Sequence, residues 1–168
     1  MIDEADAHTG APEIKGRRAV VTGGTTGIGR TIAVLLASYG VKVFICGRTP
    51  EHLHDALQRI REVGDGDGIN VDLSVAEDVD RFFESARDYL GDIDIAVINA
   101  AVPAAGLADA SESEARYQLE TDFTAYLVCA QKAARCMLAG SDIIVIGSMT
   151  AVSRGPGSSI YVAAKSGI

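Results

Sequence analysis

The chain has 168 residues, a length typical of one well-buried domain. Its formal net charge of −8 argues against nucleic acid or an anionic membrane surface as a partner, because both attract a surplus of Lys and Arg. Hydrophobic residues make up 48% of the sequence, yet no apolar run reaches the roughly 18 residues that a membrane span requires.

The N-terminal segment, residues 1–16, is predicted to be a flexible tail that precedes one domain over residues 17–168. This tail is polar and acidic, the reverse of a secretory signal peptide. The cysteines Cys46, Cys129 and Cys136 lie in apolar contexts, and we interpret them as buried free thiols of a reducing compartment. We therefore expect a cytoplasmic protein.

After the tail, short apolar runs alternate with segments of helical periodicity. The predicted strands cover residues 19–21, 41–46, 69–71, 93–98 and 143–146. The predicted helices are Ile28–Ser38, one that begins at Pro50, one opened by a capping box at residues 74–77, one from a second capping box at residues 111–114 to Leu138, and one that begins near Tyr161.

The predicted strands are runs of Val and Ile without polar alternation, as expected when helices cover both faces of a sheet. Regular alternation of strands and helices predicts an α/β fold with a doubly wound parallel sheet of the Rossmann type. The sheet would end after the fifth strand, with one edge unpaired and apolar faces uncovered. We therefore expect these residues to be part of a longer polypeptide.

A glycine-rich turn connects the first predicted strand to the first predicted helix. Glycines at this place let the backbone approach a pyrophosphate, and the N–H groups of the helix N-terminus point at it. The spacing Gly-x-x-x-Gly-x-Gly lacks the Lys-Ser/Thr ending of a P-loop. Taken alone, the turn is weak evidence, because a tight strand–helix connection is the alternative explanation for its glycines. Its candidate cofactor-binding residues are Gly23, Thr25, Thr26, Gly27, Ile28 and Gly29.

The end of the second predicted strand is where the cofactor is selected in such folds. NAD-selective members usually place Asp or Glu about 20 residues beyond the glycines, whereas NADP-selective members offer Arg nearby. Here Gly47 stands at this position and Arg48 follows it. The absence of a carboxylate and the presence of a guanidinium predict NADP as the cofactor, with NAD less favoured. The alternative is that Arg48 is simply an exposed arginine at a strand end.

Three further residues form a candidate catalytic group. Tyr161 and Lys165 are four residues apart, which places both side chains on one face of a helix. A nearby ammonium favours the phenolate and so lowers the pKa of a tyrosine, which then exchanges protons as a general acid or base. Ser148 follows the fifth strand, at the sheet edge where open α/β sheets bind ligands, and its hydroxyl is suited to hydrogen-bond a substrate oxygen.

These motifs resemble those of the short-chain dehydrogenase/reductase family over residues 17–168. The family's Thr-Gly-x-x-x-Gly-x-Gly turn matches Thr22–Gly29, and its Ser and Tyr-x-x-x-Lys match Ser148, Tyr161 and Lys165. The resemblance implies direct hydride transfer between a nicotinamide and a substrate carbon. It also implies that Tyr161 and Lys165 contact the cofactor, with Lys165 bound to the nicotinamide ribose.

The resemblance implies further cofactor contacts after the third and fourth strands. The family's Asp that touches adenine matches Asp72, which Leu73 follows, and its Asn-Ala-Gly segment matches Asn99, Ala100 and Ala101. The third residue of that segment is Ala rather than Gly, which narrows the freedom of the backbone.

A second departure from the family concerns a catalytic position. The Asn that lies in the family's long helix, and that holds the helix geometry and a proton-relay water through its backbone carbonyl, corresponds to Asp122. An ionised carboxylate is isosteric with the amide but donates no hydrogen bond. We keep Asp122 as a candidate catalytic residue with a backbone role.

These features together predict an NADP(H)-dependent oxidoreductase that transfers a hydride between nicotinamide and a ketone or secondary alcohol, with Tyr161 as general acid and base. We expect a small-molecule substrate, no nucleic-acid or membrane partner, and a homodimer or homotetramer. We expect no metal, because His52 and His54 lack ligands at metal spacing and are predicted to be surface residues. The alternative is a non-catalytic nucleotide-binding or interaction protein that retains the fold.

Overall fold

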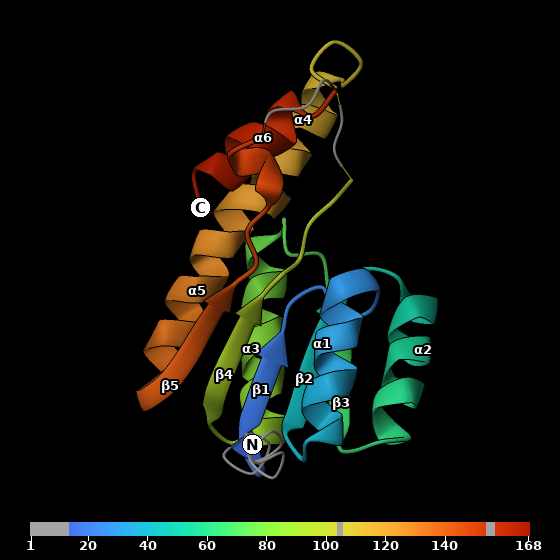
Figure 1. Ribbon diagram of the computed structural model, residues 1–168, viewed down its shortest axis with the longest axis vertical. Helices are drawn as coiled ribbons and strands as arrows, with labels where there is room; N and C mark the ends of the chain where they lie inside the picture. The colour runs from blue at the N-terminus through green and yellow to red at the C-terminus, as the bar shows by residue number, and fades with distance from the viewer. Residues whose placement is uncertain (1–13, 104–105, 154–156) are drawn as a thin grey trace, which may run out of the picture.

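A computed structural model describes residues 14–103, 106–153 and 157–168 (Figure 1). Residues 1–13 of the expected tail lie outside the described residues. From Ile14 onwards the chain is packed against the domain. The Ile14 side chain contacts one hydrophobic core, and the Gly16 N–H donates to the Gly40 carbonyl at 2.9 Å. Packing thus begins before the boundary at Arg17 that we expected.

Five parallel strands form a single sheet in the order β3-β2-β1-β4-β5. Their bounds are β1 Arg18–Val21, β2 Lys42–Gly47, β3 Gly66–Asn70, β4 Ile93–Ile98 and β5 Met137–Val145. Successive strands extend from β1 first to one side and then to the other, so the strand order reverses between β1 and β4. This is the doubly wound, Rossmann-type α/β fold that we predicted, and the reversal point is where such sheets bind ligands.

Helices cover both faces of the sheet and create two hydrophobic cores (Figure 1). The helices α1 (Gly27–Ser38) and α2 (Pro50–Arg61) pack on one face, and α3 (Ala76–Leu90) and α5 (Ala125–Cys136) on the other. Successive side chains of a strand point to opposite faces. Val20 therefore joins the core under α3 and α5, whereas Val21 joins the core under α1 and α2.

The prediction of one long helix that reaches Leu138 is wrong in two respects. It is interrupted, because α4 (Glu112–Leu119) passes into a π-helical turn at Glu120–Thr124 before α5 begins. It also ends earlier, because Met137 pairs with Ile93 and so belongs to β5. Pairing in the sheet prevails over the helical periodicity of the sequence.

The two predicted capping boxes have different outcomes. At the start of α4 the box is confirmed, since the Ser111 hydroxyl accepts from the Glu114 N–H at 3.3 Å and the Glu114 carboxylate accepts from the Ser111 N–H at 2.8 Å. The prediction of a capping box at residues 74–77 is wrong, because Val75 is the N-cap of α3. The Ser74 hydroxyl instead donates to a carboxylate oxygen of Asp72 at 2.8 Å.

The strand β5 lies at one edge of the described sheet and is poorly covered, as we expected for a sheet that ends after its fifth strand. Its residues Ile143, Ile144 and Val145 are 39%, 47% and 42% exposed, so both of its faces remain accessible. After β5 come a 3-10 turn at Met149–Ala151 and the helix α6 (Ser159–Ser166), which packs against α4 above the carboxyl ends of the strands (Figure 1). No helix in the described ranges is long and apolar enough to cross a membrane.

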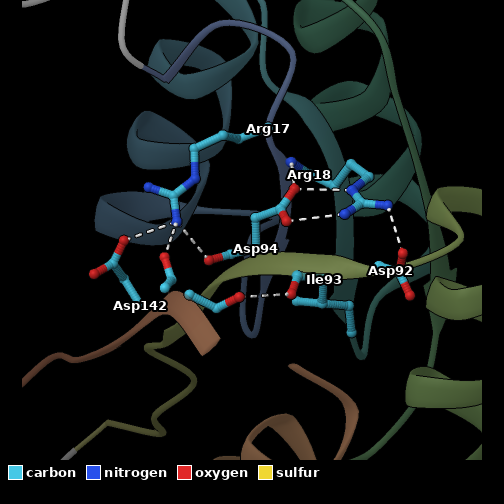
Figure 2. A network of polar contacts seen from close by, with 8 residues as sticks. Arg17, Arg18, Asp92, Ile93, Asp94 and Asp142 are labelled. Atoms are coloured by element: carbon cyan, nitrogen blue, oxygen red, sulfur yellow. Dashed lines mark hydrogen bonds and ion pairs between the residues drawn. The ribbon is translucent and has the colours of Figure 1, made fainter. Parts of the chain in front are cut away.

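At the amino ends of the strands, charged side chains connect β1, β4 and β5 (Figure 2). Arg18 donates two hydrogen bonds to the Asp94 carboxylate, at 2.8 and 2.9 Å, and pairs with Asp92 at 3.1 Å. Arg17 donates to the Asp94 carbonyl at 2.9 Å and pairs with Asp142 at 2.8 Å. We call these five residues the amino-end network. The network joins these strands at their amino ends, whereas the carboxyl ends of the strands surround a cavity.

Candidate active site

A cavity of about 640 Å³ lies at the carboxyl ends of the strands, and every strand contributes the residues that follow it. Of the predicted site residues, it is lined by Gly23, Thr25, Thr26, Gly27, Ile28, Gly29, Arg48, Asp72, Leu73, Asn99, Ala100, Ser148, Tyr161 and Lys165. Asp122 does not line it. Residues far apart in the sequence are thus assembled around one space, as the predicted fold requires.

The glycine-rich turn between β1 and α1 has a backbone that few other residues could adopt. Gly23 and Gly27 have φ values of +63° and +53°, in the left-handed region that favours glycine. A Cβ atom at Gly29 would collide with the Gly23 carbonyl and with the Asn99 amide. Asn99 also fixes the turn to β4, because its side-chain amide donates to the Thr22 carbonyl at 3.0 Å.

The geometry of this turn fits a bound pyrophosphate. A Cβ at Gly27 would meet nothing within 4 Å, so the cavity is open directly beside the backbone at this point. Thr26, the N-cap of α1, makes no side-chain cap hydrogen bond to the first turn of the helix. The N–H groups of that turn are therefore not capped by a side chain and are suited to bind an anion.

In the part of the cavity wall that follows β2 and β3, Arg48 and Asp72 are joined by Tyr117 of α4. An Arg48 guanidinium nitrogen donates to the Tyr117 phenol oxygen, and the phenol donates to the Asp72 carboxylate at 3.0 Å. Burial by itself raises the pKa of Asp72, but hydrogen bonds from Ser74 and Tyr117 and the charge of Arg48 lower it overall. The sequence contains no signal for Tyr117, since a tyrosine on a partly exposed helix belongs to no motif.

Ser148 and Tyr161 face the same cavity from two segments that follow β5. Ser148 is the N-cap of the 3-10 turn, where its hydroxyl oxygen accepts from the Thr150 N–H at 3.3 Å and lies 2.9 Å from the Thr150 hydroxyl. These contacts fix the Ser148 side chain at the cavity wall. Tyr161 is half-buried on α6.

Lys165 is the most unusual side chain of the cavity. It is 4% exposed, and its ammonium nitrogen has no hydrogen-bond partner among the described residues. The nitrogen lies 3.5 Å from the centroid of the Tyr126 ring and 5.8 Å from that of Tyr161. Burial lowers the pKa of Lys165 to about 8, against the opposing charge of Asp122. An unsatisfied donor at a cavity wall fits a ligand that accepts hydrogen bonds, such as a ribose.

Asp122 lies behind the cavity rather than in its wall. It is fully buried in the π-helical turn, where its carboxylate accepts from the Val102 N–H at 2.8 Å and from the Gln118 side-chain amide at 3.3 Å. Burial raises the pKa of Asp122, and the nearby charge of Lys165 opposes this effect. Asp122 therefore reaches the cavity only through its neighbours.

Sequence reasoning missed several residues that line the cavity: Cys46, Gly47, Thr49, His52, Val71, Ala101, Thr121, Tyr126, Ile146 and Gly147. Most are neighbours of predicted residues. His52 is exposed, as expected, but it lies at the cavity rim near Arg48. Tyr126 and Thr121 come from the long helical segment, which carries no motif for them. Within the described residues, no group of three His, Cys, Asp or Glu side chains is placed to hold a metal ion.

Comparisons with known proteins place the chain in a family. A family model described as short chain dehydrogenase matches residues 17–168. The Hydroxysteroid 11-beta-dehydrogenase 1-like protein of Danio rerio is 31% identical over 156 residues, which are 90% of this chain and 54% of that protein. The 3-oxoacyl-(acyl-carrier-protein) reductase FabG of Haemophilus influenzae is 32% identical over 92% of this chain and 64% of its own length.

Among solved structures, a short chain dehydrogenase from Burkholderia cenocepacia in complex with NADP is similar, with a TM-score of 0.85 and 30% identity. The match covers 91% of this chain and 64% of that one. The chain thus spans between 54% and 64% of the length of these three proteins.

Proposed function

The chain belongs to the short-chain dehydrogenase family, and on this premise we propose that it acts as an NADP(H)-dependent oxidoreductase on ketones or secondary alcohols. The observation that carries the proposal is the shared cavity. A glycine turn suited to a pyrophosphate and the side chains of Ser148, Tyr161 and Lys165 line one space at the switch point of the sheet.

The proposed cofactor site runs along the carboxyl ends of β1, β2, β3 and β4. The turn of residues 23–29 binds the pyrophosphate through backbone N–H groups, and Arg48 binds the 2′-phosphate of NADP. Asp72 and Leu73 contact the adenine, and Asn99 and Ala100 lie beside the dinucleotide. In support, the similar Burkholderia cenocepacia protein was solved in complex with NADP.

The proposed chemistry needs one proton transfer by the chain. The bound nicotinamide supplies a hydride to a carbonyl carbon or accepts one from an alcohol carbon. Tyr161 donates a proton to the carbonyl oxygen as general acid, or removes the hydroxyl proton of an alcohol as general base. Ser148 hydrogen-bonds the same oxygen. The Lys165 ammonium, which lines the same cavity, binds the ribose.

Asp122 has a positioning role in this proposal rather than a direct one. It fixes the segment after β4 through Val102, and its carboxylate contributes a negative charge near Lys165. For the whole protein we also propose a small carbonyl or alcohol substrate and assembly as a homodimer or homotetramer. The similar Haemophilus influenzae protein is named as a reductase of a 3-oxoacyl substrate, which is also a ketone.

The proposal is tested by following NADPH oxidation by the full chain with a panel of ketones. We expect turnover in the wild type and its loss in Tyr161→Phe, with NADPH binding nearly unchanged because only the proton donor is removed. Tyr39→Phe, which removes the hydroxyl of an exposed tyrosine at the end of α1, is the matched control. NADPH binding without turnover in the wild type would favour the non-catalytic alternative, and full activity of Tyr161→Phe would refute the proton-transfer assignment.

A further inference from the structure

Tyr117 connects two charged residues that come from different parts of the fold. Arg48 follows β2, Asp72 follows β3, and Tyr117 lies on α4. The phenol oxygen accepts a hydrogen bond from the guanidinium and donates one to the carboxylate at 3.0 Å. The guanidinium carbon also lies 5.5 Å from the centroid of the Tyr117 ring, within the range of a cation–π contact.

The electrostatics of this group maintain the direction of both hydrogen bonds. Burial raises the pKa of Tyr117, and the hydrogen bond to Asp72 adds to the effect, so the phenol stays protonated and able to donate at neutral pH. The carboxylate of Asp72 stays ionised, because its pKa is lowered overall. The Tyr117 hydroxyl thus accepts a hydrogen bond from the Arg48 cation and donates one to the Asp72 anion.

We propose that Tyr117 determines cofactor selectivity by holding the Arg48 guanidinium at the cavity wall, in position to bind the 2′-phosphate of NADP. This inference rests on the proposed function, since it needs a 2′-phosphate at Arg48. Without the hydroxyl, the exposed Arg48 side chain either moves into solvent or pairs directly with the Asp72 carboxylate. Both outcomes weaken the site, the first through lost side-chain order and the second through neutralised charge.

The contact to Tyr117 leaves Arg48 free to bind phosphate. A guanidinium has five N–H donors in a planar fork, and Tyr117 accepts from one nitrogen of it. The remaining donors are available for a bidentate contact with phosphate oxygens. Tyr117 is therefore a positioning residue that acts through Arg48, whereas Arg48 makes the contact itself.

The test uses two nucleotides without nicotinamide, so that the readout is binding rather than activity. Adenosine 2′,5′-bisphosphate carries the 2′-phosphate, and adenosine 5′-monophosphate lacks it. Each is titrated by calorimetry into the full chain as wild type, Tyr117→Phe, Arg48→Ala and the double variant. Tyr117→Phe keeps the ring and loses only the hydroxyl, and Tyr39→Phe is the matched control for removal of a hydroxyl outside the cavity.

We expect Tyr117→Phe to weaken binding of the bisphosphate about threefold to tenfold, the range that ordering one long side chain supplies. Binding of the monophosphate should change less than about twofold, apart from the small effect of the lost hydrogen bond to Asp72. In the Arg48→Ala background the effect of Tyr117→Phe on the bisphosphate should vanish, because the residue through which Tyr117 acts is gone.

Two results would overturn the inference while leaving nucleotide binding intact. One is an unchanged ratio of the two affinities in Tyr117→Phe, whether neither affinity changes or both fall equally, and the other is tighter binding of the bisphosphate. A wild type that binds both nucleotides equally would overturn the inference and the NADP preference together. A wild type that binds neither would overturn nucleotide binding itself, so the failure of the proposed function is recognised separately.

Discussion

The ammonium nitrogen of Lys165 lies 3.5 Å from the centroid of the Tyr126 ring, with no hydrogen-bond partner among the described residues. The ring face attracts a cation, but it replaces only part of the hydration that the ammonium loses on burial. This is consistent with the lowered pKa of Lys165, about 8. The side chain is thus held in place at a cost to the stability of the folded protein, which is common for groups that bind a ligand.

Replacement of Lys165 by Met should remove the cost of burying the ammonium and should thereby change the pH dependence of unfolding. Between pH of about 8 and about 10.5, the unfolded chain carries a proton on Lys165 that the folded chain has lost. The unfolded state then binds more protons, so stability rises with pH through this window. We expect the wild type to gain stability relative to Lys165→Met as the pH rises from 7.5 to about 10.

Thermal unfolding of the cofactor-free full chain at several pH values measures this difference. Lys15→Met, which removes an exposed lysine outside the cavity, is the matched control. A stability difference between wild type and Lys165→Met that stays constant over the whole range would contradict the prediction. Dinucleotide binding, measured in parallel, should weaken in Lys165→Met only.

Arg48→Ala should remove the preference for NADPH over NADH. A charge-assisted contact to a phosphate contributes about 1.5–3 kcal/mol, which corresponds to about tenfold to a hundredfold in affinity. Titration of both cofactors into the full chain, followed by fluorescence, checks this. Arg116→Ala on the exposed face of α4 is the control and should keep the preference. A wild type without any preference would show that Arg48 does not select the cofactor.

The sequence predicted the parts of the site that depend on local structure. A strand followed by closely spaced glycines and a helix needs no distant residue, so the turn of residues 23–29 was recognisable. Arg48 and Asn99 directly follow strands, Asp72 comes two residues after β3, and the carboxyl ends of parallel strands meet at one edge of a sheet. Their assembly around one cavity follows from the strand order.

The parts that were missed depend on how the helical segment from α4 to α5 packs. Tyr126 lines the cavity, whereas Tyr117 contacts Arg48 and Asp72 of its wall, and a π-helical turn lies between the two tyrosines. The helical periodicity of this segment contains no sign of such a turn. The Asp122 side chain is turned to Val102, away from the cavity wall, and the backbone role that we expected for Asp122 stays a prediction.

Asp122→Asn should stabilise the protein at neutral pH. Because burial raises the pKa of Asp122, the folded chain holds a proton more tightly than the unfolded chain does, and stability falls as the pH rises through the window above the ordinary carboxyl range. The Asn side chain does not ionise, so the variant does not lose stability in this way. The attraction to Lys165 acts in the opposite direction but is the weaker effect, since the pKa is raised overall.

Chemical denaturation at pH 7 and at pH 4 measures the effect of this substitution. The advantage of Asp122→Asn over the wild type should be larger at pH 7 and shrink at pH 4, where the wild-type carboxyl group is protonated. Asp88→Asn, on the exposed face of α3, is the matched control. A destabilised Asp122→Asn at pH 7 would show that the hydrogen bonds of the carboxylate to Val102 and Gln118 outweigh the cost of its buried charge.

Arg18→Ala should destabilise the fold without affecting nucleotide binding, because the amino-end network lies at the opposite end of the strands from the cavity (Figure 2). The Arg18 guanidinium makes two charge-assisted hydrogen bonds to Asp94, and these lower the pKa of Asp94. Both side chains are less than a third exposed, so we expect a loss of about 1–2 kcal/mol in the free energy of unfolding.

The pH dependence of this loss distinguishes the ion pair from simple packing. A carboxyl group whose pKa is lower in the folded chain adds stability above the ordinary carboxyl range and loses it as the pH falls through its folded pKa. The difference between wild type and Arg18→Ala should therefore be full at pH 7 and shrink as the pH falls below 4. Arg116→Ala, which breaks an exposed pair within α4, should cost much less at every pH. A loss for Arg18→Ala that is equally large at pH 7 and pH 3 would show that its aliphatic stem, rather than its charge, stabilises the sheet.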